Sequence, residues 1–131
     1  MTDCIFCKIT AGEIPSAKVW EDEKFYAFLD INPINPGHTL LIPKKHEDYL
    51  FELEDPHYSE IFQQAKKLAP SLKKVTGAKR IGLIVEGFLV PHVHLHLIPI
   101  HRGGELDPSR AKKASPEELS QMAEKIKAEL G

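Results

Sequence analysis

The feature of the sequence that most constrains the fold is a stretch in which histidines alternate with aliphatic residues, PHVHLHLIPI at residues 91–100. Successive side chains of a β-strand point to opposite faces, so this alternation predicts a strand, which we place at residues 93–98. His92, His94 and His96 would then form one row on one face of a sheet, with the intervening aliphatic residues facing the core. Histidine makes up only 7 of the 131 residues, so a row of three requires an explanation.

Three explanations of the histidine row are open on the residues alone. The row could face water, but solvated strand faces usually carry lysine, glutamate and threonine, which makes this explanation the weakest. Alternate histidines on a strand could hold a catalytic zinc ion with an open position for water. Alternatively, the imidazoles could act directly as nucleophile and general acid, because a pKa of about 6.5 keeps a neutral population at neutral pH. The spacing does not separate the last two explanations.

The rest of the chain predicts strands and helices in an order that favours the α+β class. Two short strands joined by a polar turn suggest antiparallel pairing, and a loop with two Asn-Pro steps follows at residues 30–39. A long amphipathic helix opens with Asp55-Pro56 and ends at Gly77, and we expect Pro70 to kink or shorten it. The predicted strands are 18–21, 25–29, 39–42, 80–85 and 93–98, and the predicted helices are 5–9, 56–75 and 115–130.

Composition limits the class of protein. A chain of 131 residues that is 42% hydrophobic and 27% charged is typical of a single globular domain. The formal net charge of −2 offers no basic field for nucleic acid or an anionic membrane. No apolar run approaches the ~20 residues of a membrane span. The N-terminus lacks a basic region followed by a long apolar stretch, so we expect no secretory signal and a cytoplasmic location.

Cys4 and Cys7 form a Cys-x-x-Cys motif near the N-terminus and are the only two cysteines. A reducing compartment disfavours a structural disulfide, and no strand precedes the motif as it would in a thioredoxin-like site. Metal binding is the better functional interpretation, provided that two more ligands exist elsewhere in the chain. Otherwise the motif is simply a pair of reduced thiols.

Two segments of the chain resemble a known family. HVHLHLIP resembles the signature of the histidine triad (HIT) superfamily, in which histidine alternates with apolar residues. CIFCKITAGEIPSAKVWEDEKFYAFLDINPINPGHTLLIPKKH, at residues 4–46, is similar to the N-terminal half of the Hint-type branch. The resemblance covers most of residues 4–100 and implies an α+β HIT fold: a five-stranded antiparallel sheet, a long helix and a C-terminal helix. It also implies a single HIT domain over residues 1–131, with its core at about 4–101 and a helical extension at about 115–130.

The resemblance also implies an activity and a set of site residues. Such proteins are usually homodimers whose two sheets join side by side. They hydrolyse or transfer nucleotides at the α-phosphate through a nucleotidyl-histidine intermediate, with purine nucleotides such as adenosine phosphoramidates as expected substrates. By this resemblance His94 is the nucleophile, His96 contacts the phosphate and assists proton transfer, and His38 completes the hydrogen-bond network. Asp30 would accept hydrogen bonds from the ribose hydroxyls. The base would lie among apolar side chains at Ile5, Phe6, Ile9, Phe28 and Ile31.

Several bacterial members of the family bind zinc, which gives the cysteine motif its two further ligands. The matching positions in this chain are Cys4, Cys7, His46 and His92. Two thiolates and two imidazoles complete a tetrahedral set and leave no position for water, so this zinc would be structural. It would tie the N-terminal segment, with two of the pocket residues, to the sheet.

The loop before the histidine strand departs from the family pattern. Typical members have an asparagine in a turn and then a Gly-Gln-Ser or Gly-Gln-Thr segment that contacts phosphate, whereas this chain reads EGFLVP at residues 86–91. Phosphate would then depend more on the histidines and on backbone amides near Gly87. The main hypothesis is a phosphoramidase-like nucleotide hydrolase with His94 as its covalent nucleophile. The alternatives are a nucleotide-binding regulatory or scaffold protein with little catalysis, and a hydrolase that uses the histidine row as zinc ligands.

Overall fold

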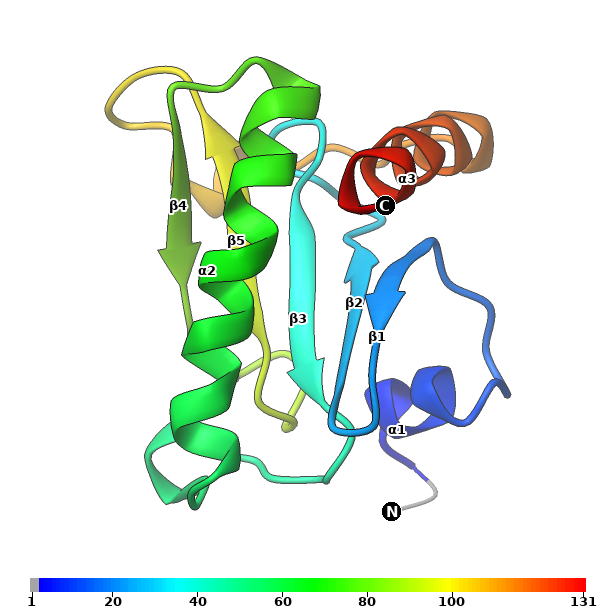
Figure 1. The fold of residues 1–131 in the computed structure, drawn as a ribbon, viewed down its shortest axis with the longest axis vertical. Helices are drawn as coiled ribbons and strands as arrows, with labels where there is room; N and C mark the ends of the chain where they lie inside the picture. The colour runs from blue at the N-terminus through cyan, green and yellow to red at the C-terminus, as the bar shows by residue number, and fades with distance from the viewer. Residues whose placement is uncertain (1–2) are drawn as a thin grey trace.

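A computed structural model describes residues 3–131 and shows one five-stranded antiparallel sheet flanked by helices (Figure 1). The α+β class and the five-stranded sheet predicted from the sequence are confirmed. In chain order the elements are α1 (Ile5–Thr10), β1 (Lys18–Glu21), β2 (Phe25–Leu29), β3 (Thr39–Pro43), α2 (His57–Thr76), β4 (Arg80–Ile84), β5 (Leu95–Ile100) and α3 (Pro116–Leu130), with short 3-10 turns at Leu50–Glu52 and Pro108–Arg110.

The strands are arranged in the order β1-β2-β3-β5-β4, and every neighbouring pair is antiparallel. β5 is therefore an inner strand, although β4 precedes it in the chain. The long helix α2 provides the connection from β3 to β4, which forms the outer edge of the sheet at the left of Figure 1. The strand that carries part of the histidine row is thus held on both sides.

The two faces of the sheet differ in what covers them. α2 and α3 cover one face, where Leu41 and Leu95 from the inner strands pack with Ile126 from α3, all fully buried. The opposite face packs against α1 through a smaller apolar cluster, which consists of Cys4, Phe6, Ile9, Tyr26, Phe28, Leu40 and Ile42. The histidine row lies on this second face, where two of its rings contact the aromatic ring of α1.

β5 begins at Leu95, later than the predicted start, so His92 and His94 precede the strand. β3 ends at Pro43, which has no N–H for a further ladder bond. The carbonyl of Pro43 accepts a hydrogen bond from the His92 ring instead (2.8 Å). The alternation of faces nevertheless holds, because Val93 is 1% exposed and packs in the core. β5 also ends two residues later than predicted, at Ile100, while the ends of the other four strands agree with the prediction to within one residue.

The helix ends follow local signals in the sequence. Pro70 does not shorten α2, which is uninterrupted over its whole length. The proline is exposed, so water can bond to the carbonyl group that it leaves unpaired. Gly77 ends α2 as predicted, in the left-handed conformation with a φ of 70°. α3 begins with the predicted capping box between Ser115 and Glu118.

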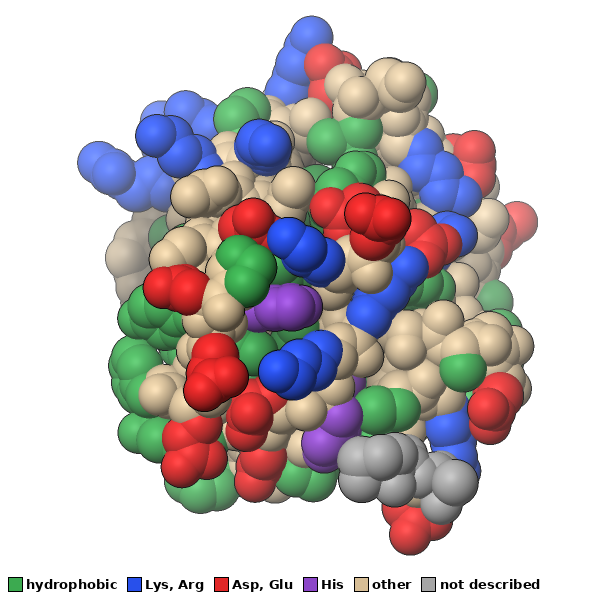
Figure 2. All heavy atoms as spheres, turned by 60° about the horizontal axis from the view of Figure 1, so that its bottom comes forward, with side chains coloured by type: hydrophobic (Ala, Val, Ile, Leu, Met, Phe, Trp, Pro, Cys, Tyr) green, Lys and Arg blue, Asp and Glu red, His purple; other side chains and the backbone are tan. Residues whose placement is uncertain are grey.

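The surface seen in Figure 2 carries acidic and basic side chains side by side, with histidine side chains visible between them. On this face acidic side chains gather toward the lower left and basic ones toward the upper left. No helix within residues 3–131 combines the length and the apolar composition needed to cross a membrane.

Candidate functional site

The histidines of the β5 region and of the loop before β3 open onto a cavity of about 370 Å³. His38, His94 and His96 line it together. The six residues predicted to hold a nucleotide line the same cavity, namely Ile5, Phe6, Ile9, Phe28, Asp30 and Ile31. Residues from both of the sequence segments that resemble the HIT family thus meet at one place on the sheet.

Hydrogen bonds assign the proton-bearing nitrogen of two of these rings. The backbone N–H of Ile34 donates to Nδ1 of His38 (3.0 Å), so the proton of His38 is on Nε2. This Nε2–H donates to Nδ1 of His96 (2.9 Å), so the proton of His96 is on its own Nε2. His96 therefore offers a donor nitrogen to the cavity that it lines.

His94 carries its proton on the other ring nitrogen, Nδ1, rather than on Nε2. Its Nδ1 lies 2.6 Å from the carbonyl oxygen of His92, which can only accept, so Nδ1 carries the proton. The lone pair of His94 is then on Nε2, as a nucleophile requires. The His94 ring lies 4.9 Å from the His96 ring, measured between centroids. The cavity therefore places a lone-pair nitrogen beside a donor nitrogen.

Burial keeps His38 and His96 neutral. Burial lowers the pKa of His38 to about 4. Burial, followed by the charges of His94 and His38, lowers the pKa of His96 to about 4. Burial also raises the pKa of Asp30, whose Oδ2 lies 3.6 Å from Nε2 of His38. The hydrogen-bond chain through the two neutral rings therefore persists into the mildly acidic range.

The apolar wall of the cavity has a buried floor and an exposed mouth. Phe6 is 6% exposed and packs edge-on against Phe28 (5.5 Å) and His94 (5.0 Å), measured between ring centroids. Ile5 and Ile31 are 44% and 59% exposed at the mouth. Exposed apolar side chains beside a buried aromatic floor are suited to covering the faces of a flat, largely apolar ligand group.

His92 points away from this cavity and toward the two cysteines. Its ring is fully buried, and its Nδ1 lies 3.3 Å from Sγ of Cys4 and 3.6 Å from Sγ of Cys7. Sγ of Cys7 lies 3.3 Å from Nδ1 of His46. The four ligand atoms all lie within 4.8 Å of one another. The structure thus brings together the four residues predicted to bind metal.

The spacing and protonation of these four residues fit a zinc ion. A tetrahedron with Zn–S and Zn–N bonds of about 2.3 and 2.0 Å separates sulfur and nitrogen ligands by about 3.5 Å, close to the observed contacts. Nε2–H of His92 donates to the Pro43 carbonyl, which leaves Nδ1 free for a metal. Burial lowers the pKa of His92, and a neutral imidazole is the form that coordinates. Burial, followed by the hydrogen bond and charge of Cys4, raises the pKa of the Cys7 thiol to about 11, so the thiol would release its proton on metal binding.

A second group of possible ligands consists of Asp30, His38 and His96. Both ring nitrogens of His38 and Nδ1 of His96 are already in hydrogen bonds, to each other and to the backbone of Ile34. Within residues 3–131, His94 belongs to neither group. The geometry therefore does not favour a hydrolase in which the histidine row itself holds a catalytic metal.

The family model for the HIT domain matches residues 11–103. The chain belongs to the HIT family. An uncharacterised HIT-like protein of Borreliella burgdorferi is 38% identical, over 89% of this chain and 89% of its own length. An adenosine 5′-monophosphoramidase of Schizosaccharomyces pombe is 37% identical, over 97% of this chain and 98% of its own length.

Solved HIT structures share the whole fold. A HIT-like protein from Bartonella henselae is 34% identical with a TM-score of 0.87, covering 98% of this chain and 97% of its own. A zinc-bound histidine triad family protein from Mycobacterium smegmatis is 27% identical with a TM-score of 0.84, covering 98% of this chain and 94% of its own. Because almost the whole chain is covered, the likeness includes the C-terminal helix α3 beyond the matched HIT domain.

Sequence reasoning missed part of the cavity of this HIT protein, namely Leu29, Asn32, Ile34, Leu40, Ile84, Ile98, Pro108 and Ala111. Leu40 pairs with His96 across β3 and β5, and Ile98 shares the face of His96, so strand alternation could have found both. Pro108 and Ala111 lie beyond the matched HIT domain and reach the cavity through the tertiary path of the chain. Nothing in their local sequence indicates this position.

The loop between β4 and β5 gives the mouth of the cavity an apolar rim. Phe88 and Leu89 are 89% and 97% exposed. Glu86 is the one polar side chain between residues 85 and 90, and it is exposed at the rim. A phosphate in the cavity would therefore meet the histidines and backbone amides rather than a polar loop side chain.

Proposed function

We propose that this HIT protein is a phosphoramidase-like hydrolase that acts at the α-phosphate of purine nucleotides, with His94 as its covalent nucleophile. The observation that carries the proposal is the opposite polarity of two neighbouring rings, a lone pair on Nε2 of His94 and a proton on Nε2 of His96. Relatives from three yeasts are named adenosine 5′-monophosphoramidase, which supports a nucleotide substrate.

The reaction would proceed in two displacements. Nε2 of His94 forms a bond to the α-phosphorus while the bond from phosphorus to the leaving nitrogen breaks. The leaving nitrogen takes up a proton from solvent and departs as an amine, while the Nε2–H of His96 donates a hydrogen bond to the phosphate and keeps its proton. A water molecule then attacks phosphorus and releases a proton to solvent, and the bond from phosphorus to His94 breaks to release the nucleoside monophosphate. The carbonyl of His92 holds the Nδ1–H of His94 throughout and stabilises the positive charge that develops on the ring.

The remaining cavity residues would position the substrate. Phe28 and Phe6 form the floor for the base, and Ile5 and Ile31 would close over it at the mouth. Asp30 is the acceptor for the ribose hydroxyls, because a carboxylate oxygen can accept from both. His38 keeps His96 in the tautomer that donates. Ile9, the last of the predicted base contacts, is 7% exposed and supports the floor from below.

The four ligands Cys4, Cys7, His46 and His92 would hold a structural zinc ion. When bound, the metal would supply a cross-link between α1 and the sheet and would take no part in the chemistry. The side chain of His92 would be a ligand in this cluster, while its backbone carbonyl orients His94. Phe6, between the two cysteines in sequence, is thereby held against the ring of the nucleophile.

We also propose that the protein is a homodimer formed at the β4 edge. β4 pairs only with β5 among the described strands, and Leu83 on β4 is 43% exposed. Two β4 edges pairing with each other would join the sheets side by side and cover these groups. We place the dimer in the cytoplasm, whose reducing conditions keep Cys4 and Cys7 as thiols for zinc. We treat residues 1–131 as one domain, with α3 as an integral extension.

The test is incubation with an adenosine 5′-phosphoramidate, with chromatography to detect AMP and intact-mass spectrometry to detect the adenylylated enzyme. Wild type should release AMP and gain one adenylyl group transiently. His94→Ala should lose both signals, whereas the matched variant His101→Ala should keep both, since His101 is exposed and outside the cavity. Full turnover by His94→Ala would rule out the covalent mechanism.

A nucleotide-binding regulatory or scaffold protein is the second candidate function. The observation that favours it is the apolar loop at Phe88 and Leu89, where HIT proteins typically contact phosphate through polar side chains. This function predicts that AMP binds in calorimetry while no phosphoramidate or dinucleoside polyphosphate is turned over. Detectable AMP release by wild type, lost in His94→Ala, would exclude it.

A further inference from the structure

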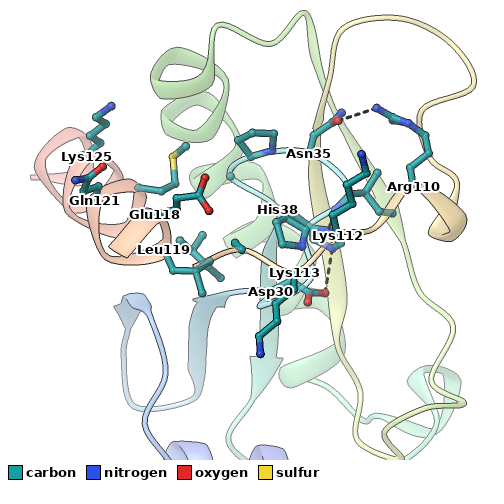
Figure 3. Close-up of a pocket in the computed structure, with 17 residues that line it drawn as sticks. Asp30, Asn35, His38, Arg110, Lys112, Lys113, Glu118, Leu119, Gln121 and Lys125 are labelled. Atoms are coloured by element: carbon teal, nitrogen blue, oxygen red, sulfur yellow. Dashed lines mark hydrogen bonds and ion pairs between the residues drawn. The ribbon is translucent and has the colours of Figure 1, made fainter. Parts of the chain in front are cut away.

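A second cavity, of about 510 Å³, adjoins the cavity that holds the three histidines (Figure 3). The two cavities share a common wall, formed by Leu29, Asp30, Ile34 and His38. The second cavity lies between the loop after β2, the segment 110–114 and α3. The reaction proposed above makes no use of it.

The segment 108–114 links the two cavities and lies beyond the residues matched by the HIT domain model. Its backbone is bound to the loop after β2 at two points. The N–H of Lys112 donates to the carbonyl of Pro33 (3.2 Å), and the N–H of Ala114 donates to the carbonyl of Ile31 (3.0 Å). Residues of this segment line both cavities, so it forms part of the wall beside the ribose position.

The second cavity carries an excess of positive charge that is not neutralised within the described chain. Lys112, Lys113 and Lys125 line it, and none of them forms an ion pair with an acidic residue of the 3–131 range. Glu118, an acidic residue of the lining, already serves in the capping box of α3. The guanidinium group of Arg110 donates hydrogen bonds to the backbone carbonyl of Glu105 and to Oδ1 of Asn35. The three free ammonium groups therefore remain available to an anion.

The shared wall indicates which anion this is. In the complex proposed above, Asp30 accepts hydrogen bonds from the ribose hydroxyls, which brings those hydroxyls to the wall. A group attached to one of the hydroxyl oxygens would cross the wall into the second cavity. We propose that the second cavity binds a phosphate carried on the ribose, so that the preferred substrates are nucleotides phosphorylated at the 2′ or 3′ oxygen. This inference rests on the proposed function, because it assumes a nucleotide beside His94.

The arrangement of charges is suited to such a phosphate. In Figure 3, Lys112 and Lys113 leave the segment in opposite directions, with the Asp30–His38 pair between them. The carboxylate of Asp30 repels a nearby phosphate, and the two ammonium groups offset that repulsion. Asp30 can still accept from the ribose hydroxyl that is not phosphorylated. The cavity volume of about 510 Å³ far exceeds the about 30 Å³ of one water molecule, so a phosphate can enter partly hydrated.

Calorimetry with three ligands tests this inference: AMP, adenosine 2′,5′-bisphosphate and adenosine 3′,5′-bisphosphate. Wild type should bind one of the bisphosphates roughly tenfold more tightly than AMP, as expected of one charge-assisted contact. The advantage should shrink as salt is added, because the lysines are exposed. In Lys112→Gln/Lys113→Gln the ratio of the two affinities should fall toward one.

A matched control removes the same charge elsewhere. Lys66→Gln/Lys67→Gln changes two exposed lysines of α2 that line neither cavity, and should keep the preference for the bisphosphate. If the Lys112 and Lys113 double variant does not fold, Lys125→Gln on α3 should lower the ratio by about twofold or more.

The outcomes separate this inference from the proposed function. Failure of wild type to bind AMP would overturn both. AMP binding with no preference for either bisphosphate would overturn the second cavity alone. A preference that survives the loss of Lys112 and Lys113 would also overturn it, because the phosphate would then be bound elsewhere.

Discussion

Acidification should destabilise the protein through His38, and the structure gives the size of the effect. The pKa of this ring is about 4 in the folded chain, against 6.5 for an unperturbed histidine, because the side chain is 2% exposed. Between these two values the unfolded chain binds more protons than the folded chain. The stability present above pH 6.5 is therefore lost as the pH falls toward about 4. For one ring the loss is about 2 kcal/mol at pH 5 and about 3.4 kcal/mol when titration is complete.

Urea unfolding at pH 8 and pH 5 measures this loss as a change in the free energy of unfolding. His38→Gln removes the titrating ring, so the variant should lose about 2 kcal/mol less than wild type between the two pH values. The carboxylates, His96 and the zinc ligands titrate in both proteins, so their contributions largely cancel in the difference. The charge of His38 is only a minor cause of the low pKa of His96, whose largest cause is burial. His101→Gln, at an exposed histidine, should show the same pH dependence as wild type.

Equal pH dependence in wild type and His38→Gln, to within about 0.5 kcal/mol, would refute the reasoning. It would mean that His38 is not held neutral by burial. The assignment of a proton to its Nε2, and with it the donor role of His96, would then need revision.

Three further predictions concern the metal cluster and the packing. In thermal melts, a chelator should lower the melting temperature of zinc-loaded wild type by about 15 °C, if the free zinc concentration before chelation is 1,000-fold above the Kd. Cys4→Ser cannot complete the cluster and should show no such change. Gly37→Ala should cost at least about 2 kcal/mol in urea unfolding, because φ is 91° and a Cβ would lie 2.6 Å from Thr76 Cγ2; Gly12→Ala, at a φ of 81° with nothing within 4 Å, should cost only about 1 kcal/mol. Ile126→Ala should cost about 2–5 kcal/mol in the same assay, because Ile126 is fully buried, and a loss below about 0.5 kcal/mol would show that α3 is not part of the folding unit.

Much of the fold was predictable because its signals are local. Alternation along the histidine stretch identified both faces of the inner strand, and Gly77 and Ser115 marked helix ends through their own conformations. The strand order was not predictable in the same way, since the place of β5 between β3 and β4 depends on long-range pairing. The late start of β5 has the same origin, because Pro43 of a different strand ends the ladder there.

The chemistry of the site divides along a similar line. The motif resemblance indicated which residues meet, and the structure brings the predicted cavity and metal residues together. It could not indicate which ring nitrogen carries each proton. Those assignments depend on the N–H of Ile34 and the carbonyls of Pro43 and His92. These are backbone groups that almost every residue has, so the residue types do not indicate which of them bonds to a histidine ring. The sequence also did not indicate Lys112 and Lys113 as cavity residues. Their segment, 108–114, reaches the site only through its tertiary contacts with the loop after β2.

The hydrogen bond from the Ile34 amide to His38 also affects how this site tolerates change. Any amino acid at position 34 other than proline supplies the same N–H. The tautomers of His38 and His96 therefore do not depend on which side chain stands at position 34. Replacing Ile34 by valine or leucine would alter only packing, whereas proline would leave Nδ1 of His38 without its donor. The ring could then take the other tautomer and turn His96 from a donor into an acceptor. An engineer who wishes to silence or reverse the relay without touching a histidine therefore has a single backbone atom to remove.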